Sequence, residues 1–331
     1  MGILNTPFNI KDIELRSRLV MPPMATAKAA EDGRVTGRLC DYYAGKSKGG
    51  QIGLIITEHS YISQEGKASV GQMSITEDGD VAGLKELVAA IHQNHTMVVA
   101  QINHAGGAAR KEVTGCEALS ASSVRIPRAA APEALPREMG QEDIRKVTAD
   151  FARAAGRAKA AGFDGVEIHS AHGYLLNQFF SPLTNRRRDG YAGTSIDGRI
   201  RLHLEIIDAV RQAVGDRYLI ALRLGACDYM EGGITLEDSV LAAPRLEEAG
   251  LDILDISGGF CGYVRPGATE QGYFSGLSEA IKKKVRIPVL LTGGIVDAGA
   301  AEALLGSHKA DLIGVGRAIL KNPDWTRQEA I

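Results

Sequence analysis

Residues 163–174 read Phe163-Asp164-Gly165-Val166-Glu167-Ile168-His169-Ser170-Ala171-His172-Gly173-Tyr174. The first half of this stretch is a short apolar run, which indicates a buried strand. The second half places two imidazoles and a phenol directly after that strand. Imidazoles can donate hydrogen bonds to a carbonyl oxygen, and a phenol can give up a proton. The stretch therefore predicts a strand that ends in a pocket suited to a substrate that becomes an enolate.

Apolar runs of the same kind recur before and after this strand, with helical patterns between them. The eight expected strands are 19–21, 53–57, 97–103, 165–169, 219–224, 251–257, 289–292 and 311–315. The helices expected between them are 38–48, 81–94, 142–161, 196–214, 236–249, 277–283 and 297–305. The strands are nearly continuous apolar runs, so both of their faces should be buried, as in a parallel sheet with crossover helices. Eight such units predict an α/β fold, a (β/α)8 TIM barrel, with residues 1–331 as one barrel domain.

Two segments outside the repeating units carry their own signals. Phe8, Ile10, Ile13 and Leu15 alternate with polar residues, which predicts a short N-terminal hairpin that plugs the N-terminal end of the barrel. The stretch 105–140 is rich in Ala, Ser and Pro. An irregular stretch of this length is usually functional, so we expect it to lie over the active face.

The bulk composition is that of an ordinary soluble protein, with 44% hydrophobic and 24% charged residues. The formal net charge is −2, so no basic surface argues for a nucleic-acid partner. No apolar run approaches the ~18 residues that a membrane span needs. The N-terminus lacks the layout of a signal peptide, and the four cysteines are scattered without a C-x-x-C pair. We therefore expect a cytoplasmic protein with reduced thiols and without a cysteine-ligated metal site.

Glycines follow the seventh and eighth expected strands. The first group is Gly293-Gly294, and the second ends in Gly316-Arg317. Barrels commonly bind phosphate with these two loops, and glycine lets backbone amides approach the ligand closely. Each pair alone could be no more than a tight turn. Both glycine groups follow the strands whose loops bind phosphate in other barrels, and Arg317 adds a positive charge. Together they predict a phosphate site. No G-x-G-x-x-G follows a strand, which argues against a Rossmann nicotinamide site.

Polar side chains also end the first, third and fifth expected strands. Gln101 ends the third strand, Arg223 ends the fifth, and Pro23-Met24-Ala25 follows the first. A buried arginine must be paired or must face an anionic ligand. Arg223 could therefore pair with Asp252, Asp255 or Glu167 inside the barrel, or it could face a ligand.

The strand-end residues and glycine loops named above occur in the same order as in the Old Yellow Enzyme family of FMN-dependent ene-reductases, which this chain resembles. The stretch 161–207 carries the most specific part of the resemblance. The resemblance implies a barrel with bound FMN that takes hydride from NADH or NADPH. It also implies a small-molecule substrate, an α,β-unsaturated carbonyl compound whose β-carbon accepts the hydride. Larger relatives carry an iron–sulfur motif and a second nucleotide-binding region that are not found here, so we expect electrons to reach FMN directly. An arginine near the ring edge of a flavin would stabilise its anionic reduced form.

By this resemblance, His169 and His172 hold the substrate carbonyl oxygen and Tyr174 supplies or relays a proton to the α-carbon. The residues that the resemblance assigns to the flavin are Pro23, Met24, Ala25, Glu58, Gln101, Arg223, Gly293, Gly294, Gly316 and Arg317. Two positions depart from the pattern. Many relatives carry Cys or Thr where this chain has Ala25, which leaves the flavin potential open. His59 stands where relatives often carry a small residue, and it is either an additional ligand-facing donor or a loop residue.

Other interpretations remain open at this point. His-x-x-His could be a metal pair, although a metal would need further ligands and Glu167 points to the opposite side of the strand from Ile168; we predict no metal. Within the same fold the alternatives are a 2,4-dienoyl-CoA or other enoyl-thioester reductase, and an oxidative C–N enzyme. A flavin-free lyase or isomerase would use the same phosphate loops. Some short relatives complete the site with an arginine from a neighbouring subunit, so a homo-oligomer is expected, with Arg327 as the last arginine available.

Overall fold

The computed structural model describes residues 2–127, 135–322 and 324–329. Eight parallel strands close into a barrel, because β4 pairs with both β3 and β6 and thereby joins the two ends of the sheet. In barrel order the strands are β3 (Leu19–Met21), β4 (Leu54–Ile56), β6 (Met97–Asn103), β9 (Gly165–Ser170), β10 (Leu219–Gly225), β11 (Ile253–Ser257), β12 (Val289–Thr292) and β13 (Leu312–Gly314). β5 (Ser60–Tyr61) extends the pairing of β6. The predicted (β/α)8 barrel is confirmed.

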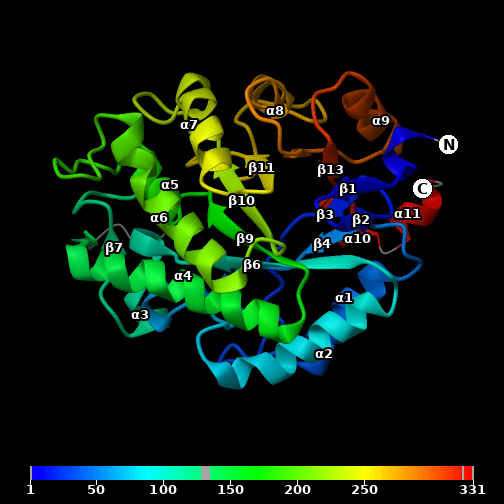
Figure 1. Ribbon diagram of the computed structural model, residues 1–331, viewed down its shortest axis with the longest axis horizontal. Helices are drawn as coiled ribbons and strands as arrows, with labels where there is room; N and C mark the ends of the chain where they lie inside the picture. Colours follow the sequence, from blue (N-terminus) through cyan, green and yellow to red (C-terminus); the bar gives the residue numbers. More distant parts are fainter. Residues whose placement is uncertain (1, 128–134, 323, 330–331) are drawn as a thin grey trace.

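Helices surround the barrel (Figure 1). The main ones are α1 (Gly37–Ser47), α2 (Val81–His92), α4 (Gln141–Ala161), α6 (Ile196–Val214), α7 (Leu236–Glu248), α8 (Ser275–Lys282), α9 (Ala298–Gly306) and α10 (Arg317–Lys321). Local sequence signals set several ends. Thr235 forms a capping box with Asp238 at the start of α7, and Gly162 ends α4 with a φ of 90°.

Shorter elements fill the connections. They are η1 (Ile3–Asn5), η2 (Gln64–Gly66), η3 (Asp78–Asp80), η4 (Gly106–Ala108), α3 (Lys111–Thr114), α5 (Leu175–Phe180), α11 (Trp325–Gln328), β7 (Leu119–Ser120) and β8 (Arg137–Glu138). The expected loop 105–140 therefore holds four of them, while its residues 128–134 lie outside the described residues. The sequence patterns missed α5, which begins directly after Tyr174.

The N-terminal hairpin closes one end of the barrel, as predicted. Its strands, β1 (Phe8–Ile10) and β2 (Ile13–Leu15), pair antiparallel. Ile10 and Leu15 join an apolar cluster with inward-facing strand residues that include Val99, Ala221 and Ile253. Strand side chains alternate between faces with a period of two. The next inward-facing positions, two residues further along the chain, therefore lie above this apolar plug.

Those next positions are polar. They are Gln101, Arg223 and Asp255, which lie two residues after Val99, Ala221 and Ile253 in their strands. All three polar side chains are buried. The register pairs Arg223 with Asp255 across β10 and β11. The fold thus separates an apolar N-terminal half of the barrel interior from a polar C-terminal half.

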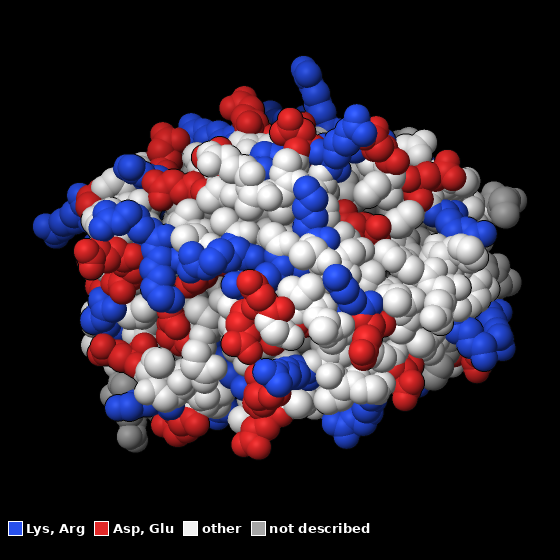
Figure 2. Space-filling view, turned by 60° about the horizontal axis from the view of Figure 1, so that its bottom comes forward, with Lys and Arg blue, Asp and Glu red and all other residues white. Residues whose placement is uncertain are grey.

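The outer surface carries charges of both signs. On the face shown in Figure 2, Lys and Arg side chains are interspersed with Asp and Glu side chains. Within the described ranges, no helix combines the length and the apolar character needed to cross a bilayer.

Candidate active site

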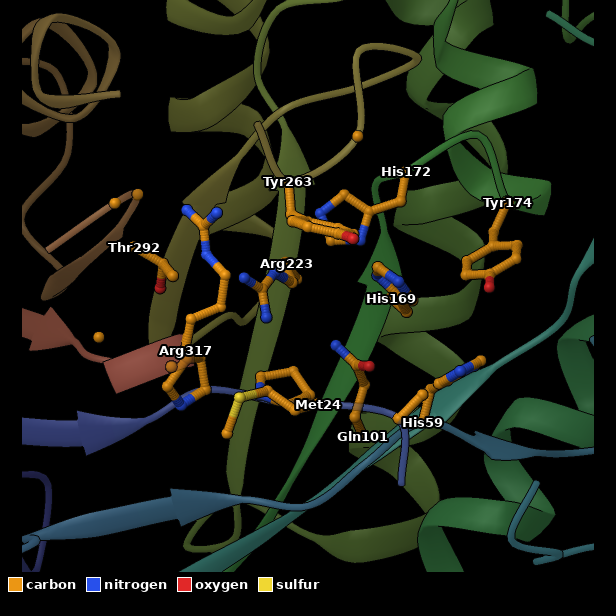
Figure 3. Close-up of a pocket in the computed structure, with 18 of the residues that line it drawn as sticks. Met24, His59, Gln101, His169, His172, Tyr174, Arg223, Tyr263, Thr292 and Arg317 are labelled. Carbon is orange, nitrogen blue, oxygen red and sulfur yellow. The ribbon is translucent and has the colours of Figure 1, made fainter. Parts of the chain in front are cut away.

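A cavity of about 760 Å³ opens at the C-terminal ends of the barrel strands. Active sites of TIM barrels lie at this end, because the loops after the strands converge there. Ile126 and Pro127, from the long connection after β6, also contribute to the lining. Figure 3 shows Thr292 and Arg317 on one side of the cavity and His169, His172 and Tyr174 on the other.

All but one of the site residues predicted from the sequence line this cavity. Those that line it are Pro23, Met24, Ala25, Gln101, His169, His172, Tyr174, Arg223, Gly293, Gly294, Gly316 and Arg317. The exception is Glu58, whose buried carboxylate accepts hydrogen bonds from the backbone and the hydroxyl of Thr26. The neighbouring residue His59, which the sequence left open, lines the cavity instead.

The two histidines and the tyrosine that follow β9 form one aromatic cluster. The ring centroids of His169 and His172 lie 5.0 Å apart, and those of His169 and Tyr174 lie 5.2 Å apart. The backbone brings His172 back toward His169, because His172 has a φ of 59° and the next residue, Gly173, has a φ of 79°. Such left-handed conformations favour glycine, so Gly173 suits this turn.

Both imidazoles are neutral at physiological pH. Removal from water lowers the pKa of His169 and of His172 well below 6.5, and the nearby charge of Arg223 lowers both further. His172 Nε2 lies 2.8 Å from the hydroxyl oxygen of Ser257. His169 Nδ1 is buried and finds no hydrogen-bond partner in the described part of the chain. The cluster therefore offers neutral N–H groups rather than imidazolium cations.

Tyr174 lies at the entrance of α5, where it is the N-cap residue. Burial raises the pKa of its phenol above 10.0, so the hydroxyl keeps its proton at neutral pH. The Tyr174 ring also stacks on His59, with centroids 5.5 Å apart and an interplanar angle of 27°. In Figure 3 the Tyr174 hydroxyl points toward the side on which His59 lies.

Beneath the cluster, a polar network occupies the barrel interior. Gln101 Nε2 donates to Glu167 Oε1 at 2.8 Å, and Arg223 Nε lies 3.4 Å from Asp255 Oδ2. Of the three carboxylates considered as partners of Arg223, Asp252 instead pairs with Lys11 and Arg211. Arg223 is only 3% exposed, yet its Nε and Nη1 have no hydrogen-bond partner among the described residues. A buried guanidinium with unused donors favours an additional anionic or carbonyl ligand.

The opposite end of the cavity is shaped by glycine. Gly293 and Gly294 have φ values of 156° and 68°. A Cβ on Gly294 would lie 2.5 Å from the Tyr273 ring, so a larger residue would displace that ring. Arg317 Nη2 donates to Tyr273 Oη at 3.1 Å and stands at the start of α10. Backbone amides and a guanidinium at this end suit a phosphate group.

These features together fit FMN. The glycines and Arg317 suit the phosphate, while Gln101 and the unused donors of Arg223 suit the polar edge of an isoalloxazine ring. Within the described residues no group of three or more His, Cys, Asp or Glu side chains is placed to hold a metal ion.

Several site residues were not found from the sequence. Ser257 binds His172, and Tyr273 joins Arg317 to the backbone carbonyl oxygen of Tyr263. Tyr263 also contacts the His172 ring at a centroid distance of 6.2 Å. Ser257 ends β11, so its position at the C-terminal end of a strand was the available signal. The tyrosines come from the long connection after β11, which has no readable pattern.

The chain is similar to curated proteins along nearly its whole length. It is 40% identical over 325 residues to an "NADH oxidase" from Thermoanaerobacter brockii, and the matched region covers 96% of this chain and 49% of that protein. It is 37% identical over 326 residues to an "NADPH dehydrogenase" from Geobacillus sp. (strain WCH70), with 98% and 92% covered. The chain thus spans about half the length of the first of these relatives and nearly all of the second.

Two solved structures are similar along the whole barrel. A 2-naphthoyl-CoA reductase in complex with 2-naphthoyl-CoA has a TM-score of 0.92 at 27% identity, covering 99% of this chain and 52% of that one. An old yellow enzyme homologue from Zymomonas mobilis has a TM-score of 0.86 at 29% identity, covering 98% and 91%. The family model described as "NADH:flavin oxidoreductase / NADH oxidase family" matches residues 4–330, so this chain belongs to that family of FMN-binding, NAD(P)H-dependent oxidoreductases, which includes Old Yellow Enzyme homologues.

Proposed function

We propose that this chain is an FMN-dependent reductase that uses NADH or NADPH to reduce the activated C=C bond of an α,β-unsaturated carbonyl compound. The observation that carries the proposal is the cluster of His169, His172 and Tyr174 at one side of a cavity whose other parts fit FMN. When bound, FMN would supply a hydride to the β-carbon of the substrate.

His169 and His172 would bind the substrate carbonyl oxygen. Their rings lie 5.0 Å apart at 80° to each other, so two N–H groups can converge on one oxygen. Negative charge gathers on that oxygen as the β-carbon is reduced. A preorganised donor at such an oxygen contributes about 3 kcal/mol to the stability of the transition state. Neutral imidazoles suit this role, because they donate without changing their protonation state.

Tyr174 would deliver the proton to the α-carbon. Its phenol is protonated at neutral pH and its ring contacts that of His169, so it lies beside the bound carbonyl group. General acids in such positions contribute about 10²- to 10⁴-fold to the rate.

The remaining residues would hold the cofactor. Gln101 and Arg223 suit the pyrimidine end of the flavin, and Pro23, Met24 and Ala25 line the cavity close to it. Gly293, Gly294, Gly316 and Arg317 suit its phosphate. Ala25 cannot donate a hydrogen bond through its side chain, so any hydrogen bond to the flavin at this position must come from the backbone.

The two half-reactions of the purified holoenzyme test the proposal. Tyr174→Phe should slow the reoxidation of the reduced enzyme by 2-cyclohexenone by at least about 10²-fold. The rate of flavin reduction by NADH or NADPH should stay within about twofold, because Tyr174 has no part in hydride acceptance by the flavin. An equal loss in both half-reactions would contradict the role of Tyr174. A colourless protein that does not take up FMN would overturn the whole proposal.

A second candidate is reduction of an unsaturated CoA thioester. It is favoured by the TM-score of 0.92 to the 2-naphthoyl-CoA reductase complex. A thioester carbonyl oxygen can accept from His169 and His172 in the same way as a ketone oxygen. Reoxidation of the reduced enzyme, followed by stopped flow with an enoyl-CoA and with 2-cyclohexenone, separates the two candidates. The better electron acceptor will give the higher second-order rate constant of reoxidation.

A further inference from the structure

His59 is a polar residue of the cavity wall that the reaction described above does not use. It stacks on Tyr174, and its ring centroid lies 6.3 Å from that of His169. The cavity thus has two neighbouring sets of donors. One set is His169 and His172, and the other is His59 and Tyr174.

The His59 ring is held by hydrogen bonds that determine which nitrogen carries its proton. Gln72 Oε1 accepts from the backbone N–H of Ala68 at 2.7 Å, so this oxygen cannot be the atom that faces His59. Gln72 Nε2 consequently faces His59, 3.0 Å from Nδ1 and 3.1 Å from the backbone oxygen. An amide nitrogen only donates. His59 Nδ1 is therefore an acceptor.

A second amide agrees with this assignment. Asn103 Nδ2 lies 3.2 Å from the same His59 Nδ1. Burial lowers the pKa of His59 to about 4, so the ring is neutral and carries a single proton. With Nδ1 accepting, that proton is on Nε2. Gln72 is only 3% exposed, which keeps this arrangement away from water.

The Nε2–H group is available to a ligand. No hydrogen bond to His59 Nε2 is found in the described part of the chain. This nitrogen is also not one of the fully buried polar atoms that lack a partner, so it is accessible from the cavity. His59 lines the cavity, and Gln72 and Asn103 occupy the other edge of the ring. A fixed donor without a partner in a substrate cavity selects ligands that supply an acceptor, because a ligand without one leaves the donor unpaired.

We infer that His59 is a specificity residue whose Nε2–H binds a second oxygen of the substrate, so that the enzyme prefers activated alkenes with two carbonyl groups, such as ene-diones and quinones, over simple enones. The inference rests on the proposed function, in which the first carbonyl oxygen lies between His169 and His172. The second oxygen would lie at the opposite end of the substrate, beside Tyr174.

A binding experiment tests His59 without turnover. Cyclohexane-1,4-dione and cyclohexanone have the same ring and differ in the second carbonyl group, and neither can be reduced at a C=C bond. Dissociation constants are measured from the change in flavin absorbance of the oxidised holoenzyme. The wild type should bind the dione about tenfold more tightly than the ketone, because of one additional hydrogen bond and the twofold statistical factor of two equivalent carbonyl groups.

His59→Phe retains the stacked ring but lacks the N–H group. We expect this variant to bind the dione only about twofold more tightly than the ketone, which is the statistical factor for two equivalent carbonyl groups, while its affinity for the ketone changes by less than about twofold. His59→Gln offers an amide N–H and should restore part of the preference. If His59→Phe loses FMN, His59→Leu replaces it, because leucine also lacks a donor. An unchanged ratio in His59→Phe, or no binding of either compound to the wild type, would overturn the inference.

Kinetics distinguish this inference from the proposed function. If 2-cyclohexene-1,4-dione and 2-cyclohexenone both reoxidise the reduced enzyme, their kcat/KM ratio should fall in His59→Phe to the same extent as the binding ratio. If neither compound is reduced although the dione binds through His59, the proposed function fails and the assignment of His59 as a binding residue stands.

Discussion

Glu167 and Asp255 are two fully buried carboxyl groups that interact inside the barrel, and neither Glu167 Oε2 nor Asp255 Oδ2 has a hydrogen-bond partner among the described residues. Two carboxylates in a buried site repel each other, so one member of the pair favours the protonated form. Burial raises the pKa of Glu167, and the charge of Asp255 raises it further. Burial raises the pKa of Asp255 to about 6, and the charge of Arg223 beside it opposes that rise. Glu167 therefore holds the proton, and Asp255 is the counter-ion of Arg223.

This relationship predicts how stability depends on pH. Since the pKa of Glu167 is raised on folding, its contribution to stability is complete below the unfolded value of 4.5 and is lost as the pH rises toward the folded pKa. Glu167→Gln keeps a neutral side chain that can donate to Asp255. As the pH rises between about 5 and 8, the free energy of unfolding of Glu167→Gln, measured in urea, should increase relative to that of the wild type. Parallel pH profiles of the two proteins would show that Glu167 is ionised.

The matched substitution at the other carboxyl should behave differently. Asp255→Asn removes the counter-ion of a guanidinium that is 3% exposed. Breaking a buried pair in this way costs about 3–5 kcal/mol of stability. We therefore expect Asp255→Asn to unfold at a much lower urea concentration than Glu167→Gln at neutral pH. Similar midpoints for the two variants would contradict the assignment of the charge to Asp255.

The neutral histidines predict a flat pH profile for the oxidative half-reaction. The pKa values of His169 and His172 lie well below 6.5, so neither ring titrates near neutrality in the folded protein. Reoxidation of the reduced enzyme by 2-cyclohexenone should show no transition near pH 6.5. Stopped-flow rates between about pH 5.5 and 8 check this. A limb with an apparent pKa near 6.5 that disappears in His169→Gln or in His172→Gln would mean that an imidazolium takes part.

The same two histidines affect stability in the acid range. Their pKa values are lowered on folding, so their contribution is present above the unfolded value of 6.5 and is lost as the pH falls below it. The contribution of the two histidines to the free energy of unfolding should therefore decrease as the pH falls from about 6.5 to 5. A variant with both His169→Gln and His172→Gln should lose less stability over this range.

The arrangement of the barrel could be predicted from the sequence because its signals are local. Apolar runs marked all eight strands, and the alternation of Phe8, Ile10, Ile13 and Leu15 marked the hairpin that plugs the barrel. The expected ends differ from the observed ends by up to two residues. The missed helix α5 has no amphipathic pattern, because all six of its residues are buried.

The candidate site was predictable only where its residues follow strands. His169, Arg223 and Gln101 were found because strand ends meet at one face of a barrel. The buried pair of Glu167 and Asp255 depends on pairing across three strands, which no local pattern reports. Glu58 was chosen by position, but in the connection between β4 and β5 its side chain accepts from Thr26, and the next side chain, His59, lines the cavity.

Ser257 is expected to fix the tautomer of His172. For His172 to donate into the cavity through Nδ1–H, its Nε2 must accept from the Ser257 hydroxyl, which lies 2.8 Å away. Ser257→Ala removes this bond. It should weaken the binding of a phenol to the oxidised holoenzyme by about three- to tenfold, the usual effect of one hydrogen bond.

Ser170→Ala is the matched control for Ser257→Ala. Ser170 Oγ lies 2.7 Å from Nε2 of another buried histidine, His203, and neither residue lines the cavity. Ser170→Ala should lower stability but leave the dissociation constant of the phenol unchanged. If both variants weaken phenol binding equally, Ser257 acts through general stability and not through His172.

The backbone conformation of Gly294 predicts how a side chain at this position would affect FMN binding. Its φ of 68° costs a residue with a Cβ roughly 1–2 kcal/mol, and that Cβ would lie 2.5 Å from the Tyr273 ring. Displacement of Tyr273 would also disturb Arg317, which donates to the Tyr273 hydroxyl. Gly294→Ala should therefore weaken FMN binding by about tenfold or more, since each 1.4 kcal/mol changes the dissociation constant tenfold.

The dissociation constant of FMN, measured by fluorescence quenching on reconstitution, checks this prediction. The matched control is Gly276→Ala in α8, because a Cβ on Gly276 would meet no atom within 4 Å. Alanine in an exposed helix position is more favourable than glycine by about 1 kcal/mol. Gly276→Ala should therefore raise the unfolding midpoint and leave FMN affinity unchanged. Equal FMN affinity in the wild type and Gly294→Ala would mean that the phosphate lies elsewhere in the cavity.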